Sequence, residues 1–419
     1  MSAICKPQAQ CVEGKVQITW YKSTPRFKTD KASGVADRAW PVRVWRREEV
    51  EFVRGEDREE YFLTRGCDGA TLIYNGPLTP SNKRKFTLVD EQANWRTTYS
   101  YFIQAEDDAR PIGPVPVRGT DPEVYWSYRR LWAELTALQA SEPARTTLIT
   151  CGYTGAGRAI PALRVGRQGP RLVLIGLIHP GESGPELIVP ALRALLEQDS
   201  ALFDHVQVLA LPAVNLDGRE MQVRGVPWYL RRTPGGIDLN RNFPADWSEP
   251  ALNYGLDSRD PDSETYRGEI GGGAAETQAV IGALRAAPPN VLLSYHALSS
   301  ICALPAIYAL AAQNDAEYER RCRATIEAFG SGLRGKQNFE ARWIKPAAEP
   351  GSLPLWTYRQ FSAPAFDLEL DQEHDDLPSA QCDEVDRPML QRYQQHHRNG
   401  LRSLLKFLSH SSVDASAYR

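Results

Sequence analysis

The chain has 419 residues, of which 42% are hydrophobic and 24% are charged, and its formal net charge is −3. This length predicts two or three domains, and the composition is ordinary for a soluble globular protein. The small negative charge gives no electrostatic reason to expect nucleic acid or an anionic membrane as a partner. No run of about 20 apolar residues is present, so no membrane span is expected.

The N-terminus and the cysteines bear on the compartment. The opening MSAICKPQAQCVEGK lacks the basic start and apolar run of a signal peptide. We therefore expect a cytoplasmic location for the sequence as it stands, with secretion after removal of a leader as the alternative. The seven cysteines are odd in number and form no CxxC pair, which predicts mostly free, buried thiols. A Cys5–Cys11 bridge is the alternative.

Residues 1–118 carry short runs of alternating polarity that predict an antiparallel β-sandwich. Turn residues separate the runs, which are VQITW ending at Trp20, PVRVWRR at 41–47, YFLTR at 61–65, TLIYNG at 71–76 and TYSYFIQA at 98–105. The order resembles a fibronectin type III domain, with the segment TTYSYFIQAEDDARPIGPVPVRGT as the last hairpin. Nothing in this region suggests a cluster of ligands.

We predict that residues 119–412 form an α/β domain and that residues 413–419 form a tail. A helix is expected in SYRRLWAELTALQAS, because Tyr128, Leu131, Leu135 and Leu138 share one helical face. Beyond it, apolar strands such as RLVLIGLI, VQVLALPAV, NVLLSYH and APAFDLEL alternate with helices such as ELIVPALRALLEQ and ETQAVIGALRAA. This alternation is typical of a mixed sheet covered by helices on both faces. Residues 244–273 read as a long irregular loop, and loops of that length are usually functional.

Two of the buried strands end in residues that bind metals. His179 and Glu182, in the sequence HPGE, follow RLVLIGLI directly, and His296 ends NVLLSYH. Ligands of open α/β sheets bind at the carboxyl ends of strands, so these side chains are expected at one edge of the sheet. Two histidines and one glutamate suit a single zinc ion and leave a position for water. Each motif alone is weak, since a buried histidine is more often part of a core.

Four further segments complete a pattern in this order. Three of them lie between HPGE and SYH, and one follows SYH. They are PAVNLDG at 212–218, YLRRT at 229–233, DLNRNF at 238–243 and FDLEL at 366–370. Together the motifs resemble the M14 zinc carboxypeptidases over about residues 125–410. The resemblance implies zinc bound by His179, Glu182 and His296, and a peptide substrate cut at its C-terminal bond.

The resemblance also implies the remaining roles. Glu369 occupies the position of the carboxylate that acts as general base and then acid. Arg231 matches the arginine that polarises the scissile carbonyl, although the adjacent Arg232 leaves that assignment open by one residue. Asn240 and Arg241 match the pair that grips the terminal carboxylate. Asp238 matches the acid that holds a ligating imidazole.

The chain departs from the family pattern around the specificity loop. The mobile tyrosine expected about six residues before Gly351-Ser352 is missing, and Trp343 or Lys345 is left as a candidate to fill its volume. Leu353 aligns with the base of the specificity pocket and favours apolar or aromatic terminal residues. The sequence does not separate protein, murein-peptide and polyglutamate substrates, nor does it give the oligomeric state.

Two other function classes stay open. An N-acyl amino acid amidohydrolase, similar to aspartoacylase or succinylglutamate desuccinylase, shares HxxE and a DLNR-like motif. A non-catalytic peptide-binding module is the other alternative. The long catalytic region, PAVNLDG and GSLPLWTYRQF favour the peptidase, and, apart from the mobile tyrosine, every polar group expected of the enzyme is present.

Overall fold

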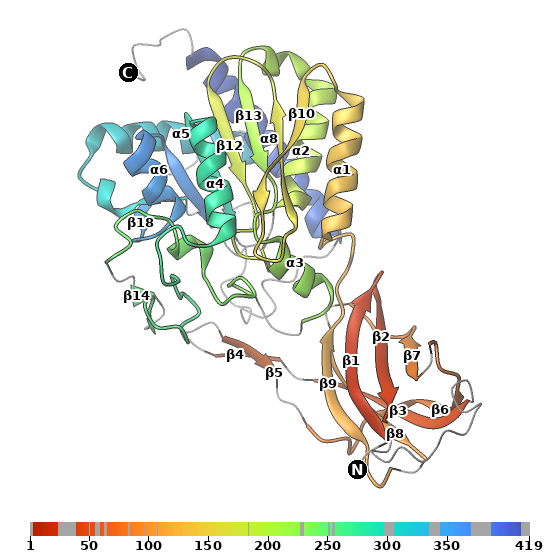
Figure 1. The fold of residues 1–419 in the computed structure, drawn as a ribbon. Helices are drawn as coiled ribbons and strands as arrows, with labels where there is room; N and C mark the ends of the chain where they lie inside the picture. Colours follow the sequence, from red (N-terminus) through yellow and green to blue (C-terminus); the bar gives the residue numbers. More distant parts are fainter. Residues whose placement is uncertain are drawn as a thin grey trace. The chain divides into compact units, whose positions relative to one another are not determined.

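A computed structural model gives the fold of the chain (Figure 1). The structure describes residues 3–23, 39–49, 51–54, 59–62, 65–82, 84–95, 97–106, 108–182, 184–226, 230–249, 252–253, 256–296, 306–334, 344–369 and 387–411. Within those ranges, no helix has both the length and the apolar character needed to cross a membrane. Five of the seven cysteines lie in them, and all five are free, so the Cys5–Cys11 bridge does not form.

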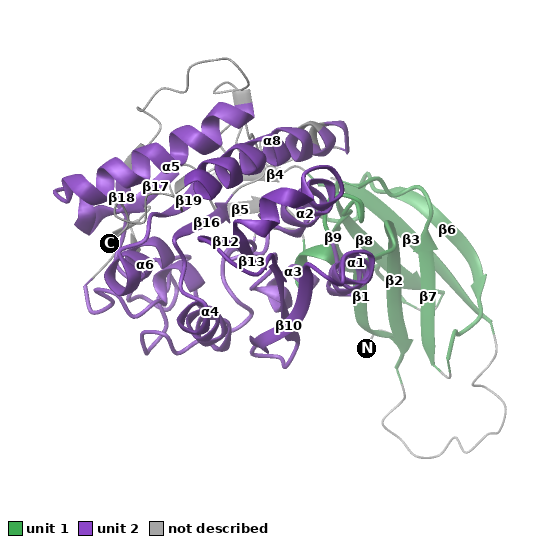
Figure 2. Cartoon of the chain, turned by 90° about the horizontal axis from the view of Figure 1, so that it is seen from above, with its two compact units in different colours: residues 1–125, 221–229 green, residues 126–220, 230–419 purple. Residues whose placement is uncertain are grey.

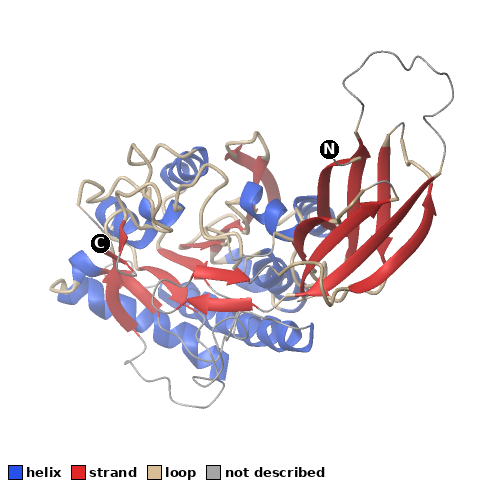
Figure 3. Ribbon diagram, turned by 90° about the horizontal axis from the view of Figure 1, so that it is seen from below, coloured by secondary structure: helices blue, strands red, loops and turns tan. Residues whose placement is uncertain are grey.

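The chain divides into two compact units (Figure 2). The first contains Met1–Tyr125 together with Met221–Tyr229, and the second contains Trp126–Glu220 and Leu230–Arg419. The division thus falls at residue 125, where the sequence suggested 118, and a distant segment joins the first unit. Figure 3 shows that the first unit consists mainly of strands, whereas the second mixes strands and helices.

The first unit contains two antiparallel sheets, ordered β1-β2-β7 and β6-β3-β8-β9, and a separate pair, β4-β5. Alternation explains β2, in which Val16, Ile18 and Trp20 are fully buried. Side chains from both main sheets form one core, as expected for a sandwich. The more specific fibronectin type III assignment stays a prediction. The strands are β1 Ile4–Val12, β2 Lys15–Lys22, β3 Trp40–Glu48, β4 Glu51–Arg54, β5 Glu59–Phe62, β6 Thr71–Leu78, β7 Lys85–Asp90, β8 Thr98–Ala105 and β9 Ile112–Arg118.

The segment from the middle of the chain joins this unit through its backbone. Cys11 donates its N–H to the Arg224 carbonyl at 2.7 Å, and Arg118 donates to the Gly225 carbonyl at 2.9 Å. The Thr120 hydroxyl donates to the Val223 carbonyl at 2.7 Å. These hydrogen bonds satisfy polar groups at the ends of β1 and β9.

The second unit is built on an eight-stranded mixed sheet, ordered β10-β11-β13-β12-β16-β19-β17-β18. The central strands β13, β12, β16 and β19 are parallel, as their continuous apolar sequences predict. Figure 2 shows α2, α5 and α8 along one face and α4 and α6 along the other. The strands are β10 Thr146–Tyr153, β11 Ala159–Val165, β12 Arg171–Ile175, β13 Gln207–Leu211, β14 Leu252–Asn253, β15 Leu256–Asp257, β16 Val291–His296, β17 Ala306–Ala309, β18 Ile344–Ala348 and β19 Ala365–Glu369.

The first helix of the second unit follows the predicted apolar face. Ser127 caps α1 by accepting a hydrogen bond from the Arg130 N–H, and Leu131, Leu135 and Leu138 are buried. The α-helices are α1 Tyr128–Ser141, α2 Pro185–Gln198, α3 Leu216–Val223, α4 Ala275–Ala286, α5 Ala316–Arg334, α6 Leu353–Phe361 and α8 Arg387–Ser411, and the 3-10 helices are η1 Ser200–Asp204, η2 Leu239–Arg241 and η3 Leu310–Ala312. The last residues of α3, from Met221, belong to the first unit.

A fully buried ion pair joins Arg219 of α3 to Glu186 of α2. Arg219 also donates to the Pro180 carbonyl at 2.9 Å, and Glu186 accepts the Trp126 N–H at 2.7 Å. Replacing Arg219 by methionine is expected to lower the free energy of unfolding by about 3–5 kcal/mol, because it leaves a buried carboxylate without its cation. Urea denaturation would measure the loss.

An exposed ion pair provides the control for that prediction. Arg402 contacts Asp199 at 2.6 Å, with 48% of the arginine side chain exposed. Arg402→Met should therefore cost less than about 1 kcal/mol. Adding Glu186→Gln to Arg219→Met should restore part of the loss. Equal stability of the two single variants would contradict the role given to the buried pair.

Candidate metal centre

The loop after β12 carries two of the predicted ligands. It turns sharply at Gly176, where an added Cβ would lie 2.4 Å from the Gly184 Cα and 2.4 Å from the Pro212 carbonyl oxygen. Only glycine permits this close approach of backbones. The turn ends β12 at Ile175, earlier than the apolar run suggested, and places His179 and Glu182 beyond the carboxyl end of the strand.

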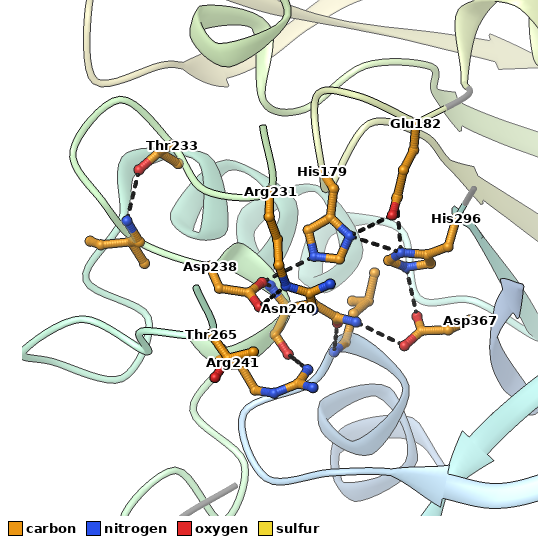
Figure 4. A network of polar contacts seen from close by, with 12 residues as sticks. His179, Glu182, Arg231, Thr233, Asp238, Asn240, Arg241, Thr265, His296 and Asp367 are labelled. Atoms are coloured by element: carbon orange, nitrogen blue, oxygen red, sulfur yellow. Dashed lines mark hydrogen bonds and ion pairs between the residues drawn. The ribbon is translucent and has the colours of Figure 1, made fainter. Parts of the chain in front are cut away.

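His296 reaches the same edge from the neighbouring strand. β16 runs parallel to β12, with Leu172 opposite Val291, and His296 is its last residue. The ligand atoms of His179, Glu182 and His296 all lie within 4.8 Å of one another, and all three residues are buried (Figure 4). The three predicted ligands therefore converge.

The donor atoms fit a tetrahedral metal ion. The two histidine Nδ1 atoms are 3.3 Å apart. Glu182 places Oε1 2.9 Å from the His179 Nδ1 and Oε2 3.1 Å from the His296 Nδ1. Ligands held about 2.0 Å from a tetrahedral zinc ion are themselves roughly 3.3 Å apart. Two imidazoles and one carboxylate thus lie at a spacing suitable for zinc.

The electrostatics of the triad also favour a cation. Burial alone would raise the pKa of Glu182, but His179 and His296 hold it well below the ordinary value. Burial would lower the pKa of His296, yet Asp367 and Glu182 raise it well above the usual range. Glu182 therefore stays ionised, and the carboxylates of Glu182 and Asp367 stabilise positive charge beside His296, which a divalent cation would supply.

Each imidazole contacts a carboxylate through its other nitrogen. The His179 Nε2 donates to Asp238 at 3.1 Å, and the His296 Nε2 donates to Asp367 at 3.1 Å. These hydrogen bonds fix the tautomer in which Nδ1 faces the metal position. Asp238 was expected in this role from the sequence. Asp367 was not, although strand alternation places it on the same face as Glu369.

The Asp367 contact leads to a prediction about metal affinity. Asp367→Asn should weaken zinc binding by about 10- to 100-fold, because the amide holds the imidazole less firmly and lowers its basicity. Competition with a chelator of known affinity would measure this. Asp246→Asn, which alters a carboxylate paired with Arg359 at 2.8 Å, is the matched control and should leave the affinity unchanged. Wild-type affinity in Asp367→Asn would argue against the proposed orientation of His296.

The structure separates the two candidate arginines. Arg231 donates from Nε to Asp238 at 2.8 Å, so it belongs to the network around His179 (Figure 4). Arg232 instead contacts Glu264 at 3.2 Å and donates to the carbonyls of Pro261 and Ser263. The position of Arg231 is the one that suits an electrophilic role at the metal centre.

Asn240 and Arg241 lie in η2, immediately after Asp238. The Asn240 amide is bonded within the protein, because Nδ2 donates to Asp367 at 2.8 Å and Oδ1 accepts the Leu353 N–H at 3.0 Å. Arg241 is buried and donates to the Asn240 carbonyl at 2.8 Å. Asn240 therefore links Leu353 to Asp367, and Arg241 is the stronger candidate for contact with a substrate anion.

Three further predictions concern residues 343–369. Glu369 pairs in register with His296 at the end of β19, but its side chain lies outside the described part of the structure. Trp343 and the side chain of Lys345, the candidates for the missing tyrosine, also lie outside it. Leu353 is described and has no exposed surface.

Comparisons with known proteins identify relatives of the chain. The sequence model of the peptidase M14 family, described as zinc carboxypeptidase, matches residues 131–392. Human carboxypeptidase B is 28% identical over 293 residues, which cover 64% of this chain and 67% of the human protein. Metallocarboxypeptidase A of Trichophyton tonsurans is 28% identical over 205 residues, and the alignment covers 43% of this chain and 46% of the fungal protein. The chain thus spans about half the length of that fungal relative.

A solved structure shares the fold. The crystal structure of the carboxypeptidase A from Helicoverpa armigera has a TM-score of 0.56 and 17% sequence identity, covering 70% of this chain and 76% of that chain. At this level of identity the likeness concerns the fold alone. The fold in question is the mixed sheet with helices on both faces.

Proposed function

Because the chain belongs to the zinc carboxypeptidase family, a family of peptide hydrolases, we propose that it is a metallocarboxypeptidase that releases the C-terminal residue of a peptide. The observation that carries the proposal is the buried network joining His179 and His296 to η2, which contains Arg241. A hydrolytic centre and an anion-binding arginine within one network suit a substrate with a free terminal carboxylate.

His179, Glu182 and His296 would hold one zinc ion. A zinc ion there would supply Lewis acidity toward a carbonyl oxygen and a lowered pKa for water. Arg241 would bind the terminal α-carboxylate and thereby place the last peptide bond at the metal centre. Arg231, of which 13% of the side chain is exposed, would stabilise the developing negative charge on the carbonyl oxygen.

Glu369 would move the proton. As the carbon–oxygen bond forms, its carboxylate would take a proton from the attacking water. It would then give that proton to the amide nitrogen as the carbon–nitrogen bond breaks, releasing a free amine. The backbone pairing of residue 369 with His296 supports this assignment. A murein-type isopeptide bond would be cleaved by the same steps.

A comparison of matched substrates tests the proposal. Zinc-loaded protein should cleave blocked peptides with a free C-terminal acid much faster than the same peptides with an amidated C-terminus. Equal rates would indicate an endopeptidase or another amidase. Faster turnover of an N-acyl amino acid would indicate an amidohydrolase, and zinc binding without any turnover would indicate a binding module.

A further inference from the structure

The surroundings of Arg241 bear on which terminal residue the site accepts. Leu353, the residue expected to read the substrate side chain, is completely buried and donates its N–H to Asn240. The Asn240 side chain is itself bonded at both ends, to Leu353 and Asp367. Neither Leu353 nor Asn240 therefore offers a free polar group that could recognise the side chain of a terminal residue bound at Arg241.

Glu349 is a charged group beside Arg241. It lies between β18 and the Gly351-Ser352 turn that precedes α6. Gly351 packs against the Arg241 backbone so closely that an added Cβ would lie 2.1 Å from the Arg241 carbonyl oxygen. This packing brings the Glu349 carboxylate to 3.5 Å from the Arg241 guanidinium, with 24% of the Glu349 side chain exposed.

The contact is looser than that of a dedicated ion pair. Charge-assisted hydrogen bonds between guanidinium and carboxylate are usually about 2.7–2.9 Å long. Here the separation is 3.5 Å, and the buried Oε2 of Glu349 makes no hydrogen bond to any residue that the structure describes. Burial raises the pKa of Glu349, and Arg241 and Arg231 only partly oppose that effect. This oxygen has thus lost water without gaining a full set of partners.

Resting on the proposed carboxypeptidase function, we infer that Glu349 is a specificity-determining residue that favours peptides ending in a cationic residue. When the terminal α-carboxylate binds Arg241, the side chain of the same residue begins within a few bonds of that guanidinium. A lysine or arginine side chain is long enough to offer Glu349 the missing cationic donor. A terminal glutamate would instead place a second carboxylate beside it, which like-charge repulsion disfavours.

Three peptides that differ only in the terminal residue test the inference. Their C-terminal residues are lysine, norleucine and glutamate, so that length is similar and charge varies. For wild-type protein, kcat/KM should be highest for lysine, at least about tenfold above norleucine, and lowest for glutamate. In Glu349→Gln the ratio of kcat/KM for the lysine peptide to that for the norleucine peptide should fall to about twofold or less, and an unchanged thermal unfolding midpoint would report an intact fold.

The matched control is Glu264→Gln, which alters an acid paired with Arg232 outside the network of Arg241. It should retain the wild-type order of the three peptides. A wild-type preference for norleucine that Glu349→Gln leaves unchanged would overturn the inference and favour recognition through Leu353. If Glu349→Gln is unstable, inhibition of the wild type by free lysine, norleucine and glutamate gives the same comparison, and the inference requires lysine to bind most tightly.

The outcome for Glu349 is separable from that for the proposed function. Failure to cleave any of the three free-acid peptides, or equal cleavage of their amidated forms, would count against the carboxypeptidase itself. Cleavage that depends on the free carboxylate but shows no response of the charge preference to Glu349→Gln would count against Glu349 alone.

Discussion

Replacing Glu369 by glutamine is expected to reduce kcat at least about a hundredfold while leaving bound zinc in place. Residue 369 is in register with His296 on the parallel neighbouring strand, so its backbone lies beside a predicted ligand. Alternation along β19 assigns it to the same face as Asp367, which contacts that histidine. Glutamine keeps the volume of the side chain but cannot accept a proton from water.

Single-turnover kinetics and zinc analysis on the same preparation would check this expectation. Asp367→Asn is the informative comparison, because its main effect should be on zinc affinity and should diminish when zinc is in excess. Near-normal kcat in Glu369→Gln would move the proton-transfer role to another acid. Asp367 is a poor substitute, since its two oxygens already accept hydrogen bonds from His296 and Asn240.

Arg241→Ala should remove the preference for a free terminal carboxylate. Arg241 is 6% exposed, and its buried Nε makes no hydrogen bond to any described residue. An anion that paired with it would therefore gain a desolvated cationic donor. We expect kcat/KM on free-acid peptides to fall roughly 30- to 700-fold, which corresponds to a loss of about 2–4 kcal/mol of transition-state stabilisation. The value of kcat/KM on amidated peptides should change little.

Rates on paired free and amidated peptides would measure the effect in both proteins. Arg232→Ala is the matched control, because Arg232 contacts Glu264 and the loop at 261–263. It should keep the wild-type discrimination. If Arg241→Ala still distinguished free acids from amides as strongly as the wild type, another residue would have to bind the terminal carboxylate.

The sequence allowed the convergence of His179, Glu182 and His296 to be predicted, because strand ends determine where residues meet. His179 and His296 are far apart in the chain, yet each follows a buried parallel strand, and the two strands are neighbours. Their shared edge follows from general rules for α/β sheets. The choice between Arg231 and Arg232 did not follow, because it depends on which side chain turns toward Asp238.

Other features left weaker signals in the sequence. Helix α6 was not predicted, because its nine residues are few, although Ser352 as N-cap and Pro354 in the first turn are signals of a helix start. Glu349 has no motif of its own and matters only through the packing of Gly351 on Arg241. The contribution of the segment at 221–229 to the first unit depends on backbone hydrogen bonds and on Gly225, where an added Cβ would lie 2.5 Å from the Arg118 carbonyl oxygen, and neither forms a recognisable motif.

That last contribution bears on how such a protein could arise. The segment Met221–Tyr229 lies inside the region that matches the peptidase family, yet it completes the N-terminal unit. An N-terminal module acquired by simple fusion of genes would be complete in itself. Here, by contrast, the N-terminal region shares hydrogen bonds with a segment of the peptidase sequence, so the two sequences constrain each other. Swapping this region between relatives should therefore succeed only when the strip at 221–229 is exchanged as well.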